Sequence, residues 1–346
     1  MKKTIFFFLF LSTCAFSTLA QDGADLSVVA ELAIRPGNVA VSADGRVFST
    51  IHPLGNPSIQ LVEITSPQQF EAFPNTEYQR STPTPSPDKL DTPLGIRIDG
   101  NNVLWIIDMG LNLGTTRLFG FDIASRKEVF RYDFPAELAP ASSFIQDLAV
   151  DEKNGWIYLA DIANPGILAL NTRTKELRRF ADESVLTENV DMVIQGQLVY
   201  FAGSPARVAI NPITLSSDKN TLYYGAMNGT TWYQVPASLF REGATDYAIS
   251  RAIKVAGPKP VSDGACTDAA GNHYFTNLQH QGVDLLTAAG ELKPFYRSSK
   301  IDWPDNVALG PDGAVYITVN QLHKTPAFTG GEDEGRPPFY IYRLPR

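Results

Sequence analysis

The chain has 346 residues, 44% of them hydrophobic and 19% charged, and its 37 Asp and Glu against 29 Lys and Arg give a net charge of -8. This composition fits a folded protein with a large core and argues against a disordered chain or a long coiled coil. No basic run is present to meet phosphates, so we expect neither a nucleic acid nor an anionic membrane as partner.

Residues 1–20 have the features of a secretory signal peptide. Two lysines precede the apolar run Ile5–Leu11, and small residues end the segment at Ala20. The run is shorter than the roughly 20 residues that cross a bilayer, and no later run predicts a transmembrane segment. We therefore predict export to the periplasm or the extracellular space. Lipoprotein anchoring through Cys14 is the weaker alternative, because its lipobox-like context has an unusual Thr13.

Cys266 is the one cysteine that remains after such cleavage, so the mature chain forms no intrachain disulfide. It lies within Gly264-Ala265-Cys266-Thr267, an apolar strand pattern. This context indicates a small buried side chain rather than a catalytic thiol.

Residues 21–346 are predicted to form one all-β domain, since helical periodicity is almost absent. One pattern recurs: an apolar strand, a turn of Asp-Gly or Asn type, and a second strand rich in aromatic and β-branched residues. The copies span residues 39–48, 96–105, 148–158, 213–224, 265–275 and 307–317. Third strands follow several copies, at residues 117–122, 166–171 and 339–344.

Repeats of roughly 40–50 residues built from short antiparallel strands are typical of propeller blades. The six copies therefore predict a six-bladed β-propeller. A β-sandwich with many hairpins is the alternative, but it would not require the same motif order at near-regular spacing. Two segments stand outside the pattern, the Pro-rich residues 81–93 and the Gly, Pro and acidic loop 325–338. The tryptophans are expected to pack between blades: Trp105, Trp156, Trp232 and Trp303.

The ordered copies also carry a family resemblance. The segments that carry it include Ile96–Asp99 with Leu104–Gly110, Ser143–Asp151, and Trp303–Asp305 with Asn320–His323, and the ordered set is more specific than any one of them. Together with the other copies, they resemble the Yellow and major royal jelly protein family over nearly the whole mature chain. The cysteine pairs of insect members are absent and Met109 stands where Thr is usual. The chain is thus similar to a bacterial relative of the dopachrome tautomerase-related kind.

The resemblance implies an exported propeller that holds a small molecule at the mouth of its central channel. Family members include proteins credited with dopachrome tautomerisation, binders of biogenic amines, and nutritive or structural proteins, so the family does not fix the reaction. Amine-binding members place ligand contacts where Asn320 and His323 stand here. Phe328 is a candidate to stack on a ligand ring.

Three acidic residues form the main candidate site. Asp147, Asp263 and Asp305 each lie just before the apolar strand of their copy, and the first strands of propeller blades line the channel. Carboxylates gathered there would raise one another's pKa, and a divalent cation (Ca²⁺, Mg²⁺, Mn²⁺ or Zn²⁺) would relieve the repulsion. The competing interpretation is that each Asp caps a turn at the start of its strand.

We therefore expect a monomer that binds a small aromatic or polar ligand, with contacts from Asp147, Asp263, Asp305, Asn320 and His323. Isomerisation would use Asp263, Asp305 or His323 as acid and base. A metal-dependent lactonase is the first alternative, because Ser262–Gly264 and Pro304–Asn306 resemble strand starts of the gluconolactonase family. A binding protein without catalysis is the second.

Overall fold

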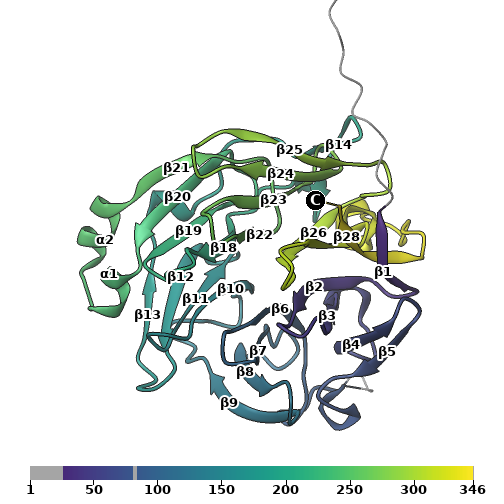
Figure 1. Ribbon diagram of the computed structural model, residues 1–346, viewed down its shortest axis with the longest axis horizontal. Helices are drawn as coiled ribbons and strands as arrows, with labels where there is room; N and C mark the ends of the chain where they lie inside the picture. Colours follow the sequence, from purple (N-terminus) through teal and green to yellow (C-terminus); the bar gives the residue numbers. More distant parts are fainter. Residues whose placement is uncertain (1–25, 81–83, 346) are drawn as a thin grey trace, which may run out of the picture.

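The computed structural model describes residues 26–80 and 84–345, so the predicted signal peptide and Cys14 lie outside the described residues. Within these ranges the strands form six four-stranded antiparallel sheets, which are arranged around a common axis (Figure 1). The predicted six-bladed β-propeller is therefore confirmed. None of the helices in the described part of the chain is long and apolar enough to span a membrane.

The first five blades each use four consecutive strands, and the first strand of each blade is innermost. The strands of blades 1 to 3 are β2 (Pro36–Val41), β3 (Val47–Ile51), β4 (Leu61–Ser66), β5 (Gln69–Ala72), β6 (Pro93–Ile98), β7 (Val103–Asp108), β8 (Arg117–Asp122), β9 (Lys127–Asp133), β10 (Ile145–Asp151), β11 (Trp156–Asp161), β12 (Gly166–Asn171) and β13 (Leu177–Phe180). Blades 4 and 5 comprise β18 (Ile210–Leu215), β19 (Thr221–Ala226), β20 (Thr231–Pro236), β21 (Lys254–Pro258), β22 (Ala265–Thr267), β23 (His273–Asn277), β24 (Gly282–Leu286) and β25 (Leu292–Arg297).

The sixth blade joins the two ends of the described chain. It combines β26 (Pro304–Leu309), β27 (Val315–Val319) and β28 (Phe339–Leu344) with β1 (Ser27–Leu32) as its outermost strand. β1 runs antiparallel to β28, with Leu32 opposite Phe339, and Figure 1 shows the two strands side by side. This pairing closes the ring of blades, so β28 is not left as an exposed sheet edge.

Local turn chemistry explains the recurring hairpins between the first two strands of a blade. In blade 2, Asp99 Oδ1 accepts hydrogen bonds from the backbone N–H groups of Asn101 and Val103, both at 2.9 Å. In blade 1 the turn uses Gly45, whose φ of +85° disfavours any side chain. The Asp-Gly and Asn turns therefore specify hairpins before any contact between blades exists.

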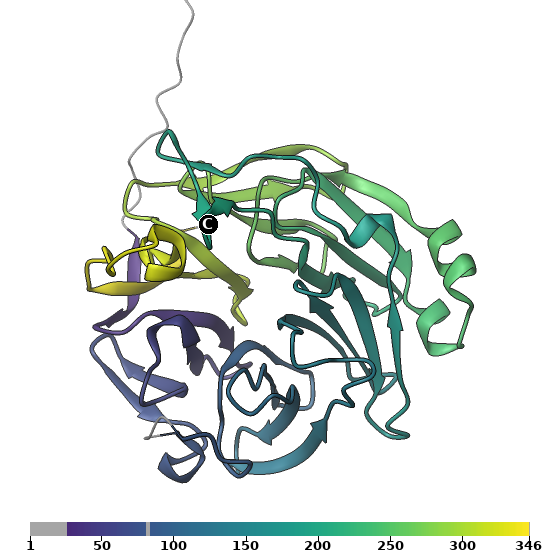
Figure 2. The same cartoon turned by 180° about the vertical axis from the view of Figure 1, so that it is seen from behind.

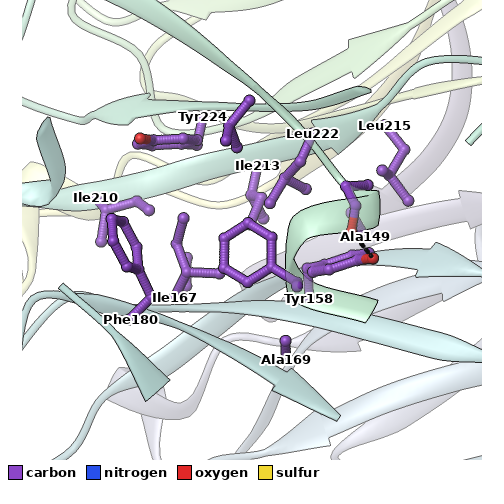
Figure 3. Close-up of a cluster of buried hydrophobic side chains, with 14 of the residues drawn as sticks. Ala149, Tyr158, Ile167, Ala169, Phe180, Ile210, Ile213, Leu215, Leu222 and Tyr224 are labelled. Carbon is purple, nitrogen blue, oxygen red and sulfur yellow. Dashed lines mark hydrogen bonds between the residues drawn. The ribbon is translucent and has the colours of Figure 1, made fainter. Parts of the chain in front are cut away.

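Apolar side chains between neighbouring blades form the core. Figure 3 shows the cluster between blades 3 and 4, where Tyr158 and Phe180 pack against Ile213 and Tyr224. Burying a side chain of this size stabilises the fold by about 1.5–3 kcal/mol. Short helices at the outer edge of blade 4 extend the cluster: α1 (Ser238–Arg241) and α2 (Asp246–Ala252) (Figure 1).

Two segments outside the blades lie together on one face. The chain between blades 3 and 4 forms two small hairpins, from β14 (Val193–Ile194), β15 (Gln197–Leu198), β16 (Tyr200–Phe201) and β17 (Ser204–Pro205). The chain between β27 and β28 contains α3 (Pro326–Thr329), which contacts β16, and Figure 2 shows the teal hairpins beside the yellow helix. The remaining helical turns are η1 (Pro53–Gly55), η2 (Thr76–Tyr78), η3 (Glu183–Val185) and η4 (Leu322–Lys324).

Candidate functional site

The end of the channel at which the inner strands begin holds a cavity of about 380 Å³, here called the upper cavity. Small-molecule sites are typically about 300–1,000 Å³ in volume and mostly apolar. The apolar lining consists of Leu54, Phe144, Ile162, Ala163, Met192, Phe201, Val208, Met227, Trp303, Leu322 and Phe328. The polar lining consists of His52, Gln146, Arg207, Asp263 and Asp305.

The two segments outside the blades cover this cavity. The rings of Phe201 in β16 and Phe328 in α3 meet edge to face, with centroids 5.0 Å apart. Phe328 in turn packs against Trp303 at 5.3 Å. The predicted irregular loop 325–338 thus includes a cavity residue, whereas the segment between β13 and β18 was not recognised from the sequence, because it carries no blade motif.

Asp263 lies two residues before the start of β22 and is 4% exposed. Its Oδ1 accepts hydrogen bonds from Asn211 Nδ2 at 2.6 Å and Gln146 Nε2 at 3.2 Å. Its Oδ2 accepts one from the indole Nε1–H of Trp303 at 2.9 Å. Burial raises the pKa of Asp263 to about 7, with a further contribution from the negative charge of Asp147, although the three donors act against it. Asp263 can therefore gain or lose a proton near neutral pH.

Asp305, the second residue of β26, lies beside a neutral histidine. Burial, and then the charges of Asp263 and Asp147, raise the pKa of Asp305 well above its usual value. Burial, and then the charge of Arg35, lower the pKa of His52 to about 3. His52 Nδ1 accepts the Leu54 N–H at 3.3 Å, which assigns the ring proton to Nε2. Nε2 lies 3.9 Å from Asp305 Oδ2, beyond hydrogen-bond distance.

A glycine brings the two acids together. A Cβ on Gly264 would lie 2.9 Å from the backbone oxygen of Asp305 and 2.9 Å from the Cα of Asn306. Real Cβ atoms do not approach backbone this closely. The absence of a side chain therefore allows the start of β22 to approach β26 at the cavity floor.

Asp147 is placed behind the cavity rather than in its lining. Its carboxylate lies 3.1 Å from the guanidinium of Arg97 on blade 2, which also donates to the Ala265 carbonyl of blade 5 at 3.3 Å. Burial raises the pKa of Asp147 to about 6, although Arg97 opposes this. Arg97 thus links blades 2 and 5 across the channel, and it lines a second cavity rather than the upper one.

Asn320 and His323 also lie behind the lining. Asn320 Nδ2 donates to Asp305 Oδ2 at 2.7 Å and to the Pro36 carbonyl at 3.0 Å. Asn320 therefore holds the Asp305 carboxyl in place without lining the cavity itself. His323 stacks on Trp303 with centroids 5.7 Å apart, and burial lowers its pKa. Of the five residues predicted at the site, the structure places Asp263 and Asp305 at the cavity.

The acids are not arranged as a carboxylate metal site. Among the residues that the structure describes, no group of three or more His, Cys, Asp or Glu side chains could hold a metal ion. Two amide oxygens are nevertheless suited to a hard cation. Asn211 Oδ1 and Asn320 Oδ1 are buried and have no hydrogen-bond partner in the described ranges, and their side chains contact Asp263 and Asp305.

Several cavity residues were missed from the sequence, among them Trp303, His52 and Arg207. Trp303 was expected to pack between blades, yet it lines the cavity and donates to Asp263. His52 and Arg207 had no motif around them. The signal that could have found Trp303 is its position two residues before Asp305.

Cys266 lines the second cavity, of about 240 Å³, at the opposite end of the channel, here called the lower cavity. Burial raises the pKa of the Cys266 thiol to about 12. A thiol that holds its proton this strongly is a poor nucleophile at neutral pH.

Similar solved structures share the fold at low sequence identity. A gluconolactonase from Xanthomonas campestris is 14% identical, with a TM-score of 0.57 over 92% of this chain and 89% of that one. The calcium-binding protein regucalcin from Agrobacterium tumefaciens is 13% identical, with a TM-score of 0.54 over 92% and 94%. A virginiamycin B lyase from Staphylococcus aureus is 14% identical, with a TM-score of 0.53 over 93% and 99%.

A search of curated proteins finds no match to the chain. The family profile described as major royal jelly protein matches residues 92–324, which is more than half of the 346 residues. That range runs from the start of blade 2 to the helical turn η4 and includes both acids of the upper cavity. The chain therefore belongs to the major royal jelly protein family, as its sequence motifs predict.

Proposed function

We propose that this protein is exported and binds a small aromatic molecule in the upper cavity, where it catalyses a proton-transfer isomerisation of the dopachrome tautomerase type. One observation carries the proposal. Asp263 and Asp305 are both buried at the floor of a mostly apolar cavity, and both have raised pKa values. A tautomerase needs a general base and a general acid next to the bound substrate, and two carboxyl groups beside an apolar wall can supply both.

The proposed step moves one proton off the substrate and one onto it. Asp263 in its carboxylate form accepts a proton from a substrate carbon as that C–H bond breaks. Asp305, whose protonated form burial favours, donates its proton to the substrate oxygen, and an O–H bond forms. The Nε2–H of His52 donates a hydrogen bond to that oxygen as negative charge develops. Solvent then returns the proton from Asp263 to Asp305, so no oxidant or reductant is consumed.

The test uses residues 21–346 and dopachrome, whose tautomerisation is followed by the loss of its visible absorbance. We expect a bell-shaped pH profile, because activity requires Asp263 ionised and Asp305 protonated. Asp263→Asn and Asp305→Asn should each lower kcat/KM by about 100-fold or more. Asp312→Asn is the control, since Asp312 pairs with Arg343 at the surface. Full activity in both site variants would reject the proposed chemistry.

Cation-assisted lactone hydrolysis is a second candidate, favoured by the unpartnered amide oxygens of Asn211 and Asn320. Together with Asp263 and Asp305 they would hold Ca²⁺ or Mg²⁺, which prefer oxygen ligands. When bound, the ion would polarise the lactone carbonyl. The names of two structural neighbours, a gluconolactonase and a calcium-binding protein, support this candidate.

Thermal unfolding tests the cation directly. EDTA should lower the midpoint and one of Ca²⁺, Mg²⁺, Mn²⁺ or Zn²⁺ should restore it, because a ligand that binds only the folded state raises the midpoint. The response should be lost in Asn211→Ala. An unchanged midpoint under all conditions would remove a tightly bound cation from consideration. Ligand binding without turnover of dopachrome or lactones would instead support a non-catalytic binding protein.

A further inference from the structure

Arg207 gives the upper cavity a positive charge at its rim. It lies between β17 and β18, in the segment that also supplies Met192 and Phe201 to the lining. Among the lining residues that the structure describes, Arg207 is the one with a permanent positive charge. His52, the other basic residue, is held neutral by burial.

The acidic partner of Arg207 is easily replaced. Arg207 Nη2 donates to Asp191 Oδ1, and the two side chains are 29% and 59% exposed. Arg207 Nη1 also donates to the backbone carbonyl of Ala206 at 2.9 Å, which orients the guanidinium without neutralising its charge. Asp191 does not line the cavity. Exposed ion pairs of this kind contribute only about 0–1 kcal/mol, because water and salt screen them. An anionic group on a ligand in the cavity would meet the guanidinium in a less hydrated setting, where charge-assisted hydrogen bonds are stronger.

The floor of the cavity favours an uncharged group. Burial raises the pKa of Asp263 to about 7 and that of Asp305 well above its usual value, so both carboxyl groups favour the protonated form more than an exposed Asp does. Protonated acids and the Nε2–H of His52 donate hydrogen bonds to a carbonyl or hydroxyl oxygen. A ligand ammonium would have fewer fixed negative charges to meet there and would be repelled by Arg207.

We propose that the ligand is an aromatic acid, which binds with its ring between the apolar walls, its carboxylate on Arg207 and an uncharged oxygen or ring edge toward Asp263 and Asp305. This inference rests on the proposed function, since it names the substrate class of the same cavity. Arg207 is then a specificity-determining residue, and Asp191 competes with the ligand carboxylate for the Arg207 guanidinium.

Calorimetry with a matched pair of probes tests the assignment. Indole-3-acetate and indole-3-acetamide share the same ring system. They differ in the group that would contact Arg207, which is a carboxylate in the first and an uncharged amide in the second. We expect the acetate to bind the wild-type protein more tightly. Arg207→Gln should weaken acetate binding by about tenfold or more and leave acetamide binding within about twofold. Asp191→Asn should have the opposite effect and strengthen acetate binding, because it removes the competing carboxylate.

The outcomes separate the two proposals. Equal binding of the two probes by the wild-type protein, or unchanged acetate binding in Arg207→Gln, would overturn the role of Arg207 and leave the proposed function standing. Failure of every aromatic probe, dopachrome included, would overturn the proposed function and this inference with it. The unfolding midpoint of each variant shows whether it folds, and Asp191→Asn supplies a test in which binding improves.

Discussion

The two ends of the channel are lined by the same inner strands but hold their charges differently. At the lower cavity the two cations of the lining are each paired with an acid: Arg97 with Asp147 at 3.1 Å, and Lys219 with Glu152 at 3.1 Å. At the upper cavity, in the described ranges, no Lys or Arg forms an ion pair with Asp263 or Asp305. The ion pairs of the lower end stabilise the propeller. At the upper end no cationic side chain in the described part of the chain neutralises the two acids, so a proton, a cation or a ligand can do so.

The largest effect on stability is expected from substitution of Arg97, the cation that pairs with Asp147. Arg97→Met would leave the buried Asp147 without its cation, at a cost of about 3–5 kcal/mol in the free energy of unfolding. Urea unfolding at pH 8 measures this loss, and a smaller loss is expected at pH 5, where Asp147 is protonated. The double variant Arg97→Met with Asp147→Asn should recover much of the stability. A double variant no more stable than the single one would contradict this account.

The unpaired acids predict that stability falls with rising pH. The folded-state pKa of Asp263, about 7, lies above its unfolded value of about 3.9, so the folded state binds more protons between these values. The free energy of unfolding should therefore decrease from pH 4 to pH 7, by on the order of 2–4 kcal/mol from this group. Asp263→Asn should flatten the curve, while Asp312→Asn should keep the wild-type slope. Equal slopes in both variants would refute the assignment.

Two tryptophans, one at each end of the propeller, donate the same kind of indole hydrogen bond to an Asp carboxylate and so form a matched pair for substitution. Trp303→Phe removes the indole donor to Asp263, and Trp105→Phe removes the equivalent bond to Asp99 at 2.8 Å in the lower part of the propeller. Loss of a hydrogen bond to a charged group costs about 1.5–3 kcal/mol, so the pKa of Asp263 should rise. The acidic limb of the pH–activity profile should then move upward by about 1–2 pH units in Trp303→Phe alone. Parallel shifts in both variants would mean that the site is perturbed indirectly.

The smallest effect is expected at the lower rim. Lys219→Met removes a partly exposed ion pair, so the free energy of unfolding should fall by about 1 kcal/mol or less. Affinity for indole-3-acetate in the upper cavity should stay unchanged in the same calorimetric assay. A loss of binding would show that the two ends are coupled through the channel.

Local sequence was sufficient to predict the blades. Each hairpin is specified by alternating side chains and by Asp, Asn or Gly in its turn, as Asp99 illustrates, and these interactions span only a few residues. The pairing of β1 with β28 was not predicted, since it joins residues about 300 positions apart and carries no turn signal of its own. The cover formed by residues between β13 and β18 was missed for the same reason.

For the site, the sequence by itself determined that Asp263 and Asp305 stand at the start of inner strands, and so at one end of the channel. Only the tertiary structure decided which of the three acids forms an ion pair with a basic side chain, because Arg97 reaches Asp147 from another blade. It likewise placed His52, Trp303 and Arg207 around the same cavity. The physical reason is that strand position depends on local pattern, whereas burial, charge pairing and cavity shape depend on side chains that the closed ring of blades brings together.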